Sequence, residues 1–496
     1  MNFTQIKIPP GVFRNGTQYQ AMGRYFDANL VRWQEGVLKP IGGWTLLTQE
    51  EFEGRARSLL QWRDNSGFRY LAVGTNAHLY VWSDRGDLRD VTPVGFQVGR
   101  IDSIYGAGFG YGTYGTGEYG TVRDDVDTVV LPAASWQFDN WGENLVACAF
   151  HDGGLYEWSL DVDEKAQIIT NAPTNNRGLI VTPERHLVLI GAGGNPRRVQ
   201  WSDREDNTTW TPTATNTAGA IDLQTNGLLQ RAVLIRGQVL LFTDQDLHLM
   251  TFVGSPFTYG VDIAGRACGL TSPNGVAVVD AQAVWMGEDS FYTFDGTVKS
   301  LPCDVQDFVF GDLNKFQQAK ISCGVNTEFN EVWWFYPSKD SLECDRYVVW
   351  NHSENHWTIG ALARTSWAPA TVFEHPIAAS PDGKLYYQEN GWTNAGAPIK
   401  SERYVESGAV DLTPGNNLLS ARRLVPDERT QGQTQITFKL RMAPNSDEVT
   451  VGPYEMSPFT DLRWSARQAA IRIEGTADAD WRVGVPRLDA VPGGQR

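Results

Sequence analysis

The feature that most constrains the fold is a recurring unit of short β-rich runs separated by tight turns. Between about residues 55 and 395, apolar runs are punctuated by Gly, Asp, Asn or Pro about every 8–12 residues. Each unit contains an apolar strand, a tight turn and then a run such as "LYVW", "LYEW", "FYTF" or "LYYQ". Six or seven four-stranded units of about 40–50 residues are typical of the blades of a β-propeller. A pair of large β-sandwiches and a solenoid are the alternatives.

The two ends of the chain follow a different pattern. Near the N-terminus, "NLVRW" and "VLKPI" read as short strands joined by a Glu35-Gly36 turn. Residues 399–496 read as longer alternating strands with wider loops. We therefore predict an all-β fold, with a six- or seven-bladed propeller over residues 49–398. A smaller antiparallel β platform domain is expected over 399–496, completed by strands from residues 1–48.

One stretch, residues 304–318, reads as helical. Asp304 is a candidate N-cap, and Gly311 interrupts the pattern, so two short turns are as compatible with the sequence as one helix.

Charge and cysteine content exclude several classes of protein. The net charge of −16 argues against broad nucleic-acid binding, because affinity for DNA comes mainly from Lys and Arg that neutralise phosphates. An acidic wall is nevertheless suited to a passage along which DNA slides. The five Cys form no C-x-x-C pair, which argues against a disulfide framework or a zinc site and favours a reducing cytoplasm. The start lacks a signal-peptide core, and no apolar run reaches the length of a membrane span.

The stretch "YGAGFGYGTYGTGEYGT" at 105–121 contains seven Gly and five aromatic residues. Its G-x-G-x-x-G match is not followed by a helix opening, which argues against a phosphate-binding loop. A mobile linker is one reading. We favour a long projecting loop within the second blade, ordered against a neighbouring subunit or lining a passage. The residues expected to form this channel or interface loop are Tyr105, Phe109, Tyr111, Tyr114, Glu118 and Tyr119.

The remaining motifs favour structural roles over chemistry. His352 and His356 have an H-x-x-x-H spacing, but they lie between two strand-like runs and are expected in a hairpin turn. The acid clusters in "WSDREDNTTW" and "WSDRGD" are expected to cap turns. No catalytic, cofactor-binding or metal-binding residue is predicted, and the chain is not expected to be an enzyme. Arg and Trp interleave at five positions expected at a subunit interface, namely Arg32, Trp33, Trp464, Trp481 and Arg482.

The order of several loose motifs resembles a known family. The matching segments are 14–44, the Gly-Tyr stretch leading into 136–158, then 199–212, 291–314, 346–360 and 470–496. Together they resemble the β-propeller virion proteins of tailed bacteriophages that form the nozzle or hub of short tails (the tail tubular protein B-like family). A long-tailed phage could use a relative of such a protein elsewhere.

The resemblance implies a virion protein of the tail, assembled in the host bacterial cytoplasm. It implies a ring, most often a homohexamer, attached to the tail adaptor on the portal and serving as a docking site for tail fibres or tailspikes. The ring would enclose the channel through which viral DNA is retained and ejected without sequence-specific binding. The family implies no catalytic residues and no cofactor.

Two rival functions are compatible with the same residues. A carbohydrate-binding or glycan-degrading propeller could stack sugars on its Trp-rich surface. A scaffold propeller that recruits other proteins in a cell is the second rival.

Overall fold

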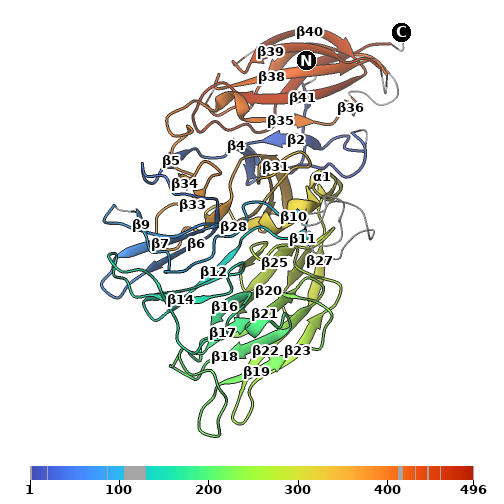
Figure 1. Cartoon of the computed structure of the whole chain (residues 1–496). Helices are drawn as coiled ribbons and strands as arrows, with labels where there is room; N and C mark the ends of the chain where they lie inside the picture. The colour runs from blue at the N-terminus through green and yellow to red at the C-terminus, as the bar shows by residue number, and fades with distance from the viewer. Residues whose placement is uncertain are drawn as a thin grey trace, which may run out of the picture.

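The structure, a computed structural model, contains a ring of seven four-stranded antiparallel sheets and a two-sheet platform (Figure 1). It describes residues 3–18, 20–86, 88–105, 130–411, 417–430, 432–443, 446–458 and 460–494. The all-β prediction of a propeller with a smaller platform is confirmed, and within the described residues the blades number seven.

Each of the first six blades runs in sequence order from its inner to its outer strand. The first three blades are β6 (Ala56–Arg63), β7 (Arg69–Thr75), β8 (Leu79–Ser83) and β9 (Leu88–Asp90); β12 (Trp136–Trp141), β13 (Asn144–Ala149), β14 (Leu155–Trp158) and β15 (Gln167–Ile168); and β16 (Gly178–Val181), β17 (Leu187–Ile190), β18 (Arg198–Trp201) and β19 (Gly219–Asp222). The next three are β20 (Leu229–Ile235), β21 (Gln238–Thr243), β22 (Leu247–Gly254) and β23 (Thr258–Gly265); β24 (Val276–Val279), β25 (Gln282–Met286), β26 (Phe291–Phe294) and β27 (Val298–Leu301); and β28 (Ser322–Asn326), β29 (Glu331–Tyr336), β30 (Arg346–Asn351) and β31 (His356–Ala361).

The seventh blade closes the ring with a strand from the other end of the propeller sequence. Its first three strands are β32 (Ser366–Ala368), β33 (Ile377–Ala379) and β34 (Leu385–Gln388), and its outer strand is β5 (Trp44–Leu46). β32 also lies beside β6, so the last blade contacts the first. The domain boundary expected after residue 48 therefore differs from the topology, because β5 belongs to the propeller.

The platform consists of two sheets that pack face to face. One has the order β1 (Phe3–Gln5), β42 (Arg487–Pro492), β37 (Leu419–Val425) and β40 (Thr460–Ala466). The other has the order β2 (Tyr25–Asn29), β35 (Tyr404–Ser407), β41 (Gln468–Gly475), β38 (Thr434–Arg441) and β39 (Val449–Glu455), with β36 (Val410–Asp411) also paired to β41. Strand β40 alternates buried and exposed residues, as expected for a strand with one face in a core.

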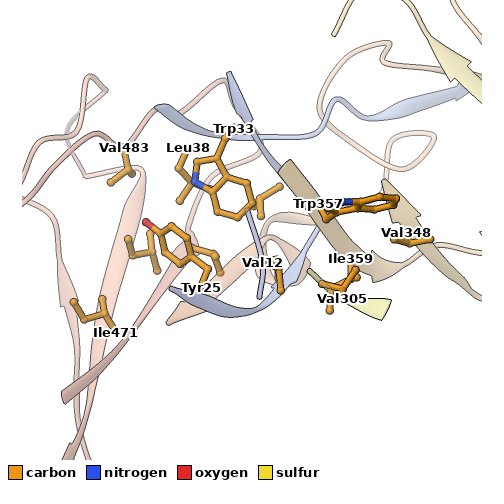
Figure 2. Close-up of a cluster of buried hydrophobic side chains, with 14 of the residues drawn as sticks. Val12, Tyr25, Trp33, Leu38, Val305, Val348, Trp357, Ile359, Ile471 and Val483 are labelled. Atoms are coloured by element: carbon orange, nitrogen blue, oxygen red, sulfur yellow. The ribbon is translucent and has the colours of Figure 1, made fainter. Parts of the chain in front are cut away.

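A hairpin of β3 (Val31–Gln34) and β4 (Val37–Pro40) joins the platform to the propeller. Its Glu35-Gly36 turn has positive φ at both residues, which matches the predicted tight turn. Trp33 and Leu38 from this hairpin pack with Tyr25 and the platform residue Val483 (Figure 2), and Leu38 and Val483 exchange backbone hydrogen bonds of 3.0 and 2.9 Å. The same apolar cluster continues into Trp357 of the sixth blade, so the two domains share one core.

Arg32 ties the hairpin to two blades. Its guanidinium donates two 2.9 Å hydrogen bonds to Glu331 of β29 and a further one to Glu389, next to β34. It also lies 3.7 Å from the ring centroid of Phe329. All three charged side chains are buried, and burial raises the pKa of Glu331 against the opposing charge of Arg32. Removing one partner would leave a buried charge without compensation.

The helical stretch is two short helices, α1 (Gln306–Asp312) and the 3-10 helix η2 (Lys315–Lys320). The break falls at Leu313 and Asn314 rather than at Gly311, and Asn314 caps η2 by accepting a hydrogen bond from the Phe316 N–H. Asp304 does not cap α1, because its carboxylate is paired with Arg24 at 2.8 Å.

The other regular elements are minor. They are the 3-10 turns η1 (Ala192–Gly194) and η3 (Lys400–Glu402), and the two-stranded sheet β10 (Ile104–Tyr105) and β11 (Val130–Leu131). Among the described helices, none is long and apolar enough to cross a membrane.

The shared core makes Trp33 a test of the joint. Replacing Trp33, which is 2% exposed, by Ala should lower the free energy of unfolding by about 3–5 kcal/mol, because the cavity lies between the domains. Urea unfolding followed by circular dichroism, together with limited proteolysis near residues 40–44, measures the effect. Leu342→Ala, at a site that is 57% exposed, is the control and should change stability by less than about 0.5 kcal/mol. Equal effects of the two substitutions would contradict a shared core.

Candidate functional site

The ends of the glycine-tyrosine stretch lie on one face of the propeller. Strands β10 and β11 form a two-stranded base between the first and second blades, with Ile104 opposite Leu131 and Tyr105 opposite Val130. The stretch therefore joins the first and second blades. The sequence analysis had placed it within the second blade, and that prediction is wrong. Of the predicted loop residues, Tyr105 is described, whereas Phe109, Tyr111, Tyr114, Glu118 and Tyr119 lie outside the described residues.

The base is attached to the helices on the far side of the ring. The Tyr105 ring lies 4.4 Å from the ring centroid of Phe316 in η2. Next to it, Ser103 and Gln317 form two hydrogen bonds. The Gln317 side-chain oxygen accepts from the Ser103 N–H at 2.9 Å, and the Gln317 side-chain nitrogen donates to the Ser103 carbonyl at 3.1 Å. Gln317 is 1% exposed, so this contact is shielded from water. The segment before the insertion is thus held firmly.

Four charged side chains strengthen the same attachment. Glu343 accepts two hydrogen bonds from Arg57 of β6, at 2.9 and 2.7 Å, and pairs with Lys320 at 3.1 Å. Lys320 also pairs with Asp102, and Arg57 donates to the Ile101 carbonyl at 2.7 Å. Burial alone would raise the pKa of Glu343, but the hydrogen bonds and charges of Arg57 and Lys320 lower it below its ordinary value. Glu343 therefore stays ionised near neutral pH, and its network links the first and sixth blades.

Hydrogen bonds from Asn274 cross the axis of the ring. Its amide nitrogen donates to the Arg57 carbonyl in the first blade at 2.7 Å, and its side-chain oxygen accepts from Arg231 of the fourth blade at 3.2 Å. Its backbone carbonyl accepts from the Cys323 N–H of the sixth blade at 2.7 Å. Burial lowers the pKa of Arg231 to about 10. We call Asn274, Arg231 and Arg57 the axial hub; at this level the centre of the propeller is filled.

Gln137 also bridges blades that are not neighbours. Its amide donates to the Gln230 carbonyl at 2.7 Å, from the second blade to the fourth. A Cβ on the intervening Gly178 would lie 2.2 Å from the Gln137 side-chain oxygen, so only glycine leaves room for the crossing.

Two adjoining cavities open on the face next to this hub. The larger, of about 710 Å³, lies between loops of the third, fourth and fifth blades, and the second, of about 490 Å³, extends toward β11 and η2. Both are bordered by Asp244, Gln245, Gly269 and Glu288. Charged groups of both signs, such as Arg197 and Asp246, line the larger one. Such a lining suits a polar ligand or a polar loop of a partner.

Four of the five predicted interface residues are buried inside the chain. Arg32 and Trp33 form the joint described above, Trp464 packs on Phe438 at 5.1 Å between the platform sheets, and Trp481 is fully buried. Arg482 is partly exposed and pairs with Asp480 at 3.0 Å. The expectation that these positions face another subunit does not fit this burial, because Trp and Arg here anchor the chain to itself.

The paired histidines and one acid cluster lie at turns. His352 and His356 flank the β30–β31 hairpin turn, and no group among the described residues could hold a metal ion. In the acid cluster, Asp203 accepts three hydrogen bonds, from Arg204 and from both the N–H and the hydroxyl of Thr217. Burial opposes but does not overcome these bonds, which lower the pKa of Asp203. All five Cys are free thiols.

The hub and the cavities were not predicted from the sequence. Asn274 lies in "SPNG", which reads as an ordinary turn, and the inner-strand position of Arg231 carries no sequence signal of its own.

Comparisons with known proteins give only distant likenesses. No family model matches the chain, and no curated protein matches it. Among solved structures, virginiamycin B lyase from Staphylococcus aureus has a TM-score of 0.43 at 7% identity, covering 70% of this chain and 97% of the lyase. The Pan2 WD40 domain of Neurospora crassa has a TM-score of 0.41 at 8% identity, covering 72% and 97%. An exo-beta-1,3-galactanase from Phanerochaete chrysosporium has a TM-score of 0.31 at 10% identity, covering 91% and 100%.

The axial hub predicts a large effect for one amide. Asn274→Ala should lower the free energy of unfolding by about 2–4 kcal/mol, because it removes the side-chain hydrogen bonds to the Arg57 carbonyl and to half-buried Arg231. Thermal and urea unfolding of the full chain would measure this. Asn226→Ala, at an exposed loop position, is the matched control and should be close to neutral. A neutral Asn274→Ala would show that the axis does not depend on this side chain.

Proposed function

We propose that this chain is a structural subunit of a bacteriophage tail, acting as the nozzle or hub that surrounds the DNA exit channel. Several copies form a ring, joined to the tail adaptor and offering a docking site for fibres or tailspikes. The proposal assigns no reaction to the chain. Its first support is the ordered set of motifs that resembles this family of virion proteins.

The observation that carries the proposal is the filled axis of the propeller. Asn274 connects the first, fourth and sixth blades, and Gln137 connects the second and fourth, so the centre of one subunit offers no room for a duplex. A DNA duplex, whose major groove alone is about 12 Å wide, would need a passage between copies. A ring of copies meets that need, provided that its subunit contacts are heterologous and close on themselves.

The distribution of charge agrees with a wall that does not retain DNA. In residues 44–398, which form the propeller, Asp and Glu outnumber Lys and Arg by 43 to 24. Outside residues 44–398, the numbers of acidic and basic residues are nearly equal. A propeller surface of this sign repels phosphate, so a passing duplex would slide without being held by counterion release.

The rigid joint supports a mechanical role. The platform and the propeller share a core, and Arg32 binds carboxylates of the sixth and seventh blades. A subunit whose domains move as one body transmits force from an attached adaptor to the ring. The insertion between the first and second blades, fixed at Ser103 and Tyr105, is the segment we assign to the passage or to a neighbouring subunit.

A second function is favoured by one feature. The polar cavity of about 710 Å³ between three blades is large enough for a short glycan, which would make the chain a carbohydrate-binding or glycan-degrading module. A glycan array and a reducing-sugar assay test this directly. A specific glycan hit that is lost in Arg197→Ala, in a chain that stays monomeric, would favour this module over the ring.

The ring is tested by imaging the purified chain with and without its tail adaptor. Negative-stain microscopy and light scattering should show a closed ring of about six copies once the adaptor is present. Deleting residues 106–120 should leave the ring intact but give particles that leak DNA or lose fibres. A chain that is monomeric in both conditions would contradict the ring. If the deletion changes neither DNA retention nor fibre number, the insertion is only a linker.

A further inference from the structure

The end of the molecule opposite the platform carries two segments that contain no charged side chain. Residues 207–221 and 249–261 contain no Asp, Glu, Lys or Arg, although these types make up 20% of the chain. The first segment connects β18 to β19, and the second forms the hairpin of β22 and β23. In Figure 1 these four strands lie at the far end of the propeller from β39 and β40. We call the two segments the charge-free tip.

The hairpin of the charge-free tip exposes large apolar side chains. Phe257 at the turn is 75% exposed, Val253 is 57% exposed and Phe252 is 43% exposed. The neighbouring segment presents exposed hydroxyls, among them those of Thr211 and Thr213. The surface therefore has an apolar end flanked by uncharged groups that can bond to water or to lipid headgroups.

The two segments are fixed to each other and to the third blade. The Thr258 hydroxyl donates to the Thr217 carbonyl at 3.1 Å, and the Tyr259 hydroxyl lies 2.9 Å from His186 and 2.8 Å from Thr182. His186 also contacts the Thr217 hydroxyl at 3.0 Å. Since Tyr259 and His186 are buried, the hairpin is already ordered before it meets any partner. Binding through the hairpin therefore costs little conformational entropy.

From this arrangement we infer that the charge-free tip inserts into the interface of a zwitterionic phospholipid membrane. The hydrocarbon region beneath the headgroups excludes charged side chains and accepts exposed Phe and Val, while hydroxyl groups can remain at headgroup level. The acidic body of the chain disfavours an anionic membrane. This inference does not depend on the ring proposed above.

The composition of the tip favours lipid over a protein partner. Strong protein contacts concentrate exposed Trp, Tyr and Arg. Here Trp210 and Tyr259 are both 3% exposed, and the side chains at the hairpin end are Phe and Val. The end is also a narrow projection, whereas standard protein interfaces bury about 800 Å² on each partner.

Flotation of the full chain with phosphatidylcholine vesicles tests the inference. The natural chain should float with the vesicles, and the double variant Val253→Ser with Phe257→Ser should reduce the bound fraction at least tenfold. A matched control changes two residues elsewhere that are also exposed, Val94→Ser and Leu342→Ser, and should bind like the natural chain. Addition of phosphatidylglycerol to the vesicles should weaken binding.

A labelled variant reports insertion directly. The variant Ser255→Cys adds a thiol at the tip. Four of the natural thiols are buried, and burial raises the pKa of the fifth, Cys323. An environment-sensitive maleimide dye should therefore react with the added thiol. Its emission should shift to the blue with vesicles, while a dye on Val94→Cys should not respond.

Three outcomes would overturn the inference. The first is a natural chain that does not float, and the second is a hairpin variant that floats as well as the control. The third is a hairpin variant that keeps vesicle binding but loses mass in lipid-free light scattering, which would make the tip a contact between copies.

Discussion

One guanidinium group holds the molecule's separate parts in register. Arg32 lies on a hairpin that belongs to neither the propeller nor the platform sheets, yet it binds carboxylates of the sixth and seventh blades. The N-terminal strands on either side of it are distributed accordingly: β2 enters the platform, and β5 completes the seventh blade. Because the ion pairs are buried, this arrangement is costly to break, and both domains depend on it.

The centre of the propeller shows how a ring of strands becomes a solid body. Polar side chains of the inner strands bond across the axis, and Asn274 satisfies donors and acceptors from three blades. The insertion starts beside this hub and is held by Gln317 and by the pairs among Arg57, Lys320 and Glu343. One polar network therefore both fixes the base of the insertion, β10 and β11, and fills the axis. Both features are used above in the proposal that the chain forms a wall around a passage.

Much of the fold could be predicted because each blade repeats local signals. Apolar runs, tight turns and the "LYVW"-like strands identify the blades, and "LYVW" itself lies in β8 of the first blade. The blade count was harder, because the last blade takes β5 from a distant part of the sequence. The interface residues were misassigned for a physical reason: Trp33 and Trp481 have the composition of interface anchors, but burial decides whether they face a partner or the chain itself. The axial hub could not be found from sequence, since its contact between Asn274 and Arg57 joins residues 217 positions apart.

The closing strand sets an order for folding during synthesis. Thr45 pairs with Tyr387, so β5 leaves the ribosome long before its partner exists, by roughly 20–70 s at typical elongation rates. The delay is longer for β1, which pairs with β42, and for β2, which pairs with β35. Throughout that interval the nascent chain presents unpaired strand edges, which are sites of aggregation. The propeller cannot close until β34 has been made, and the platform cannot be completed until β42 has been made. Chains that end before these strands should therefore be recognised by chaperones and proteases.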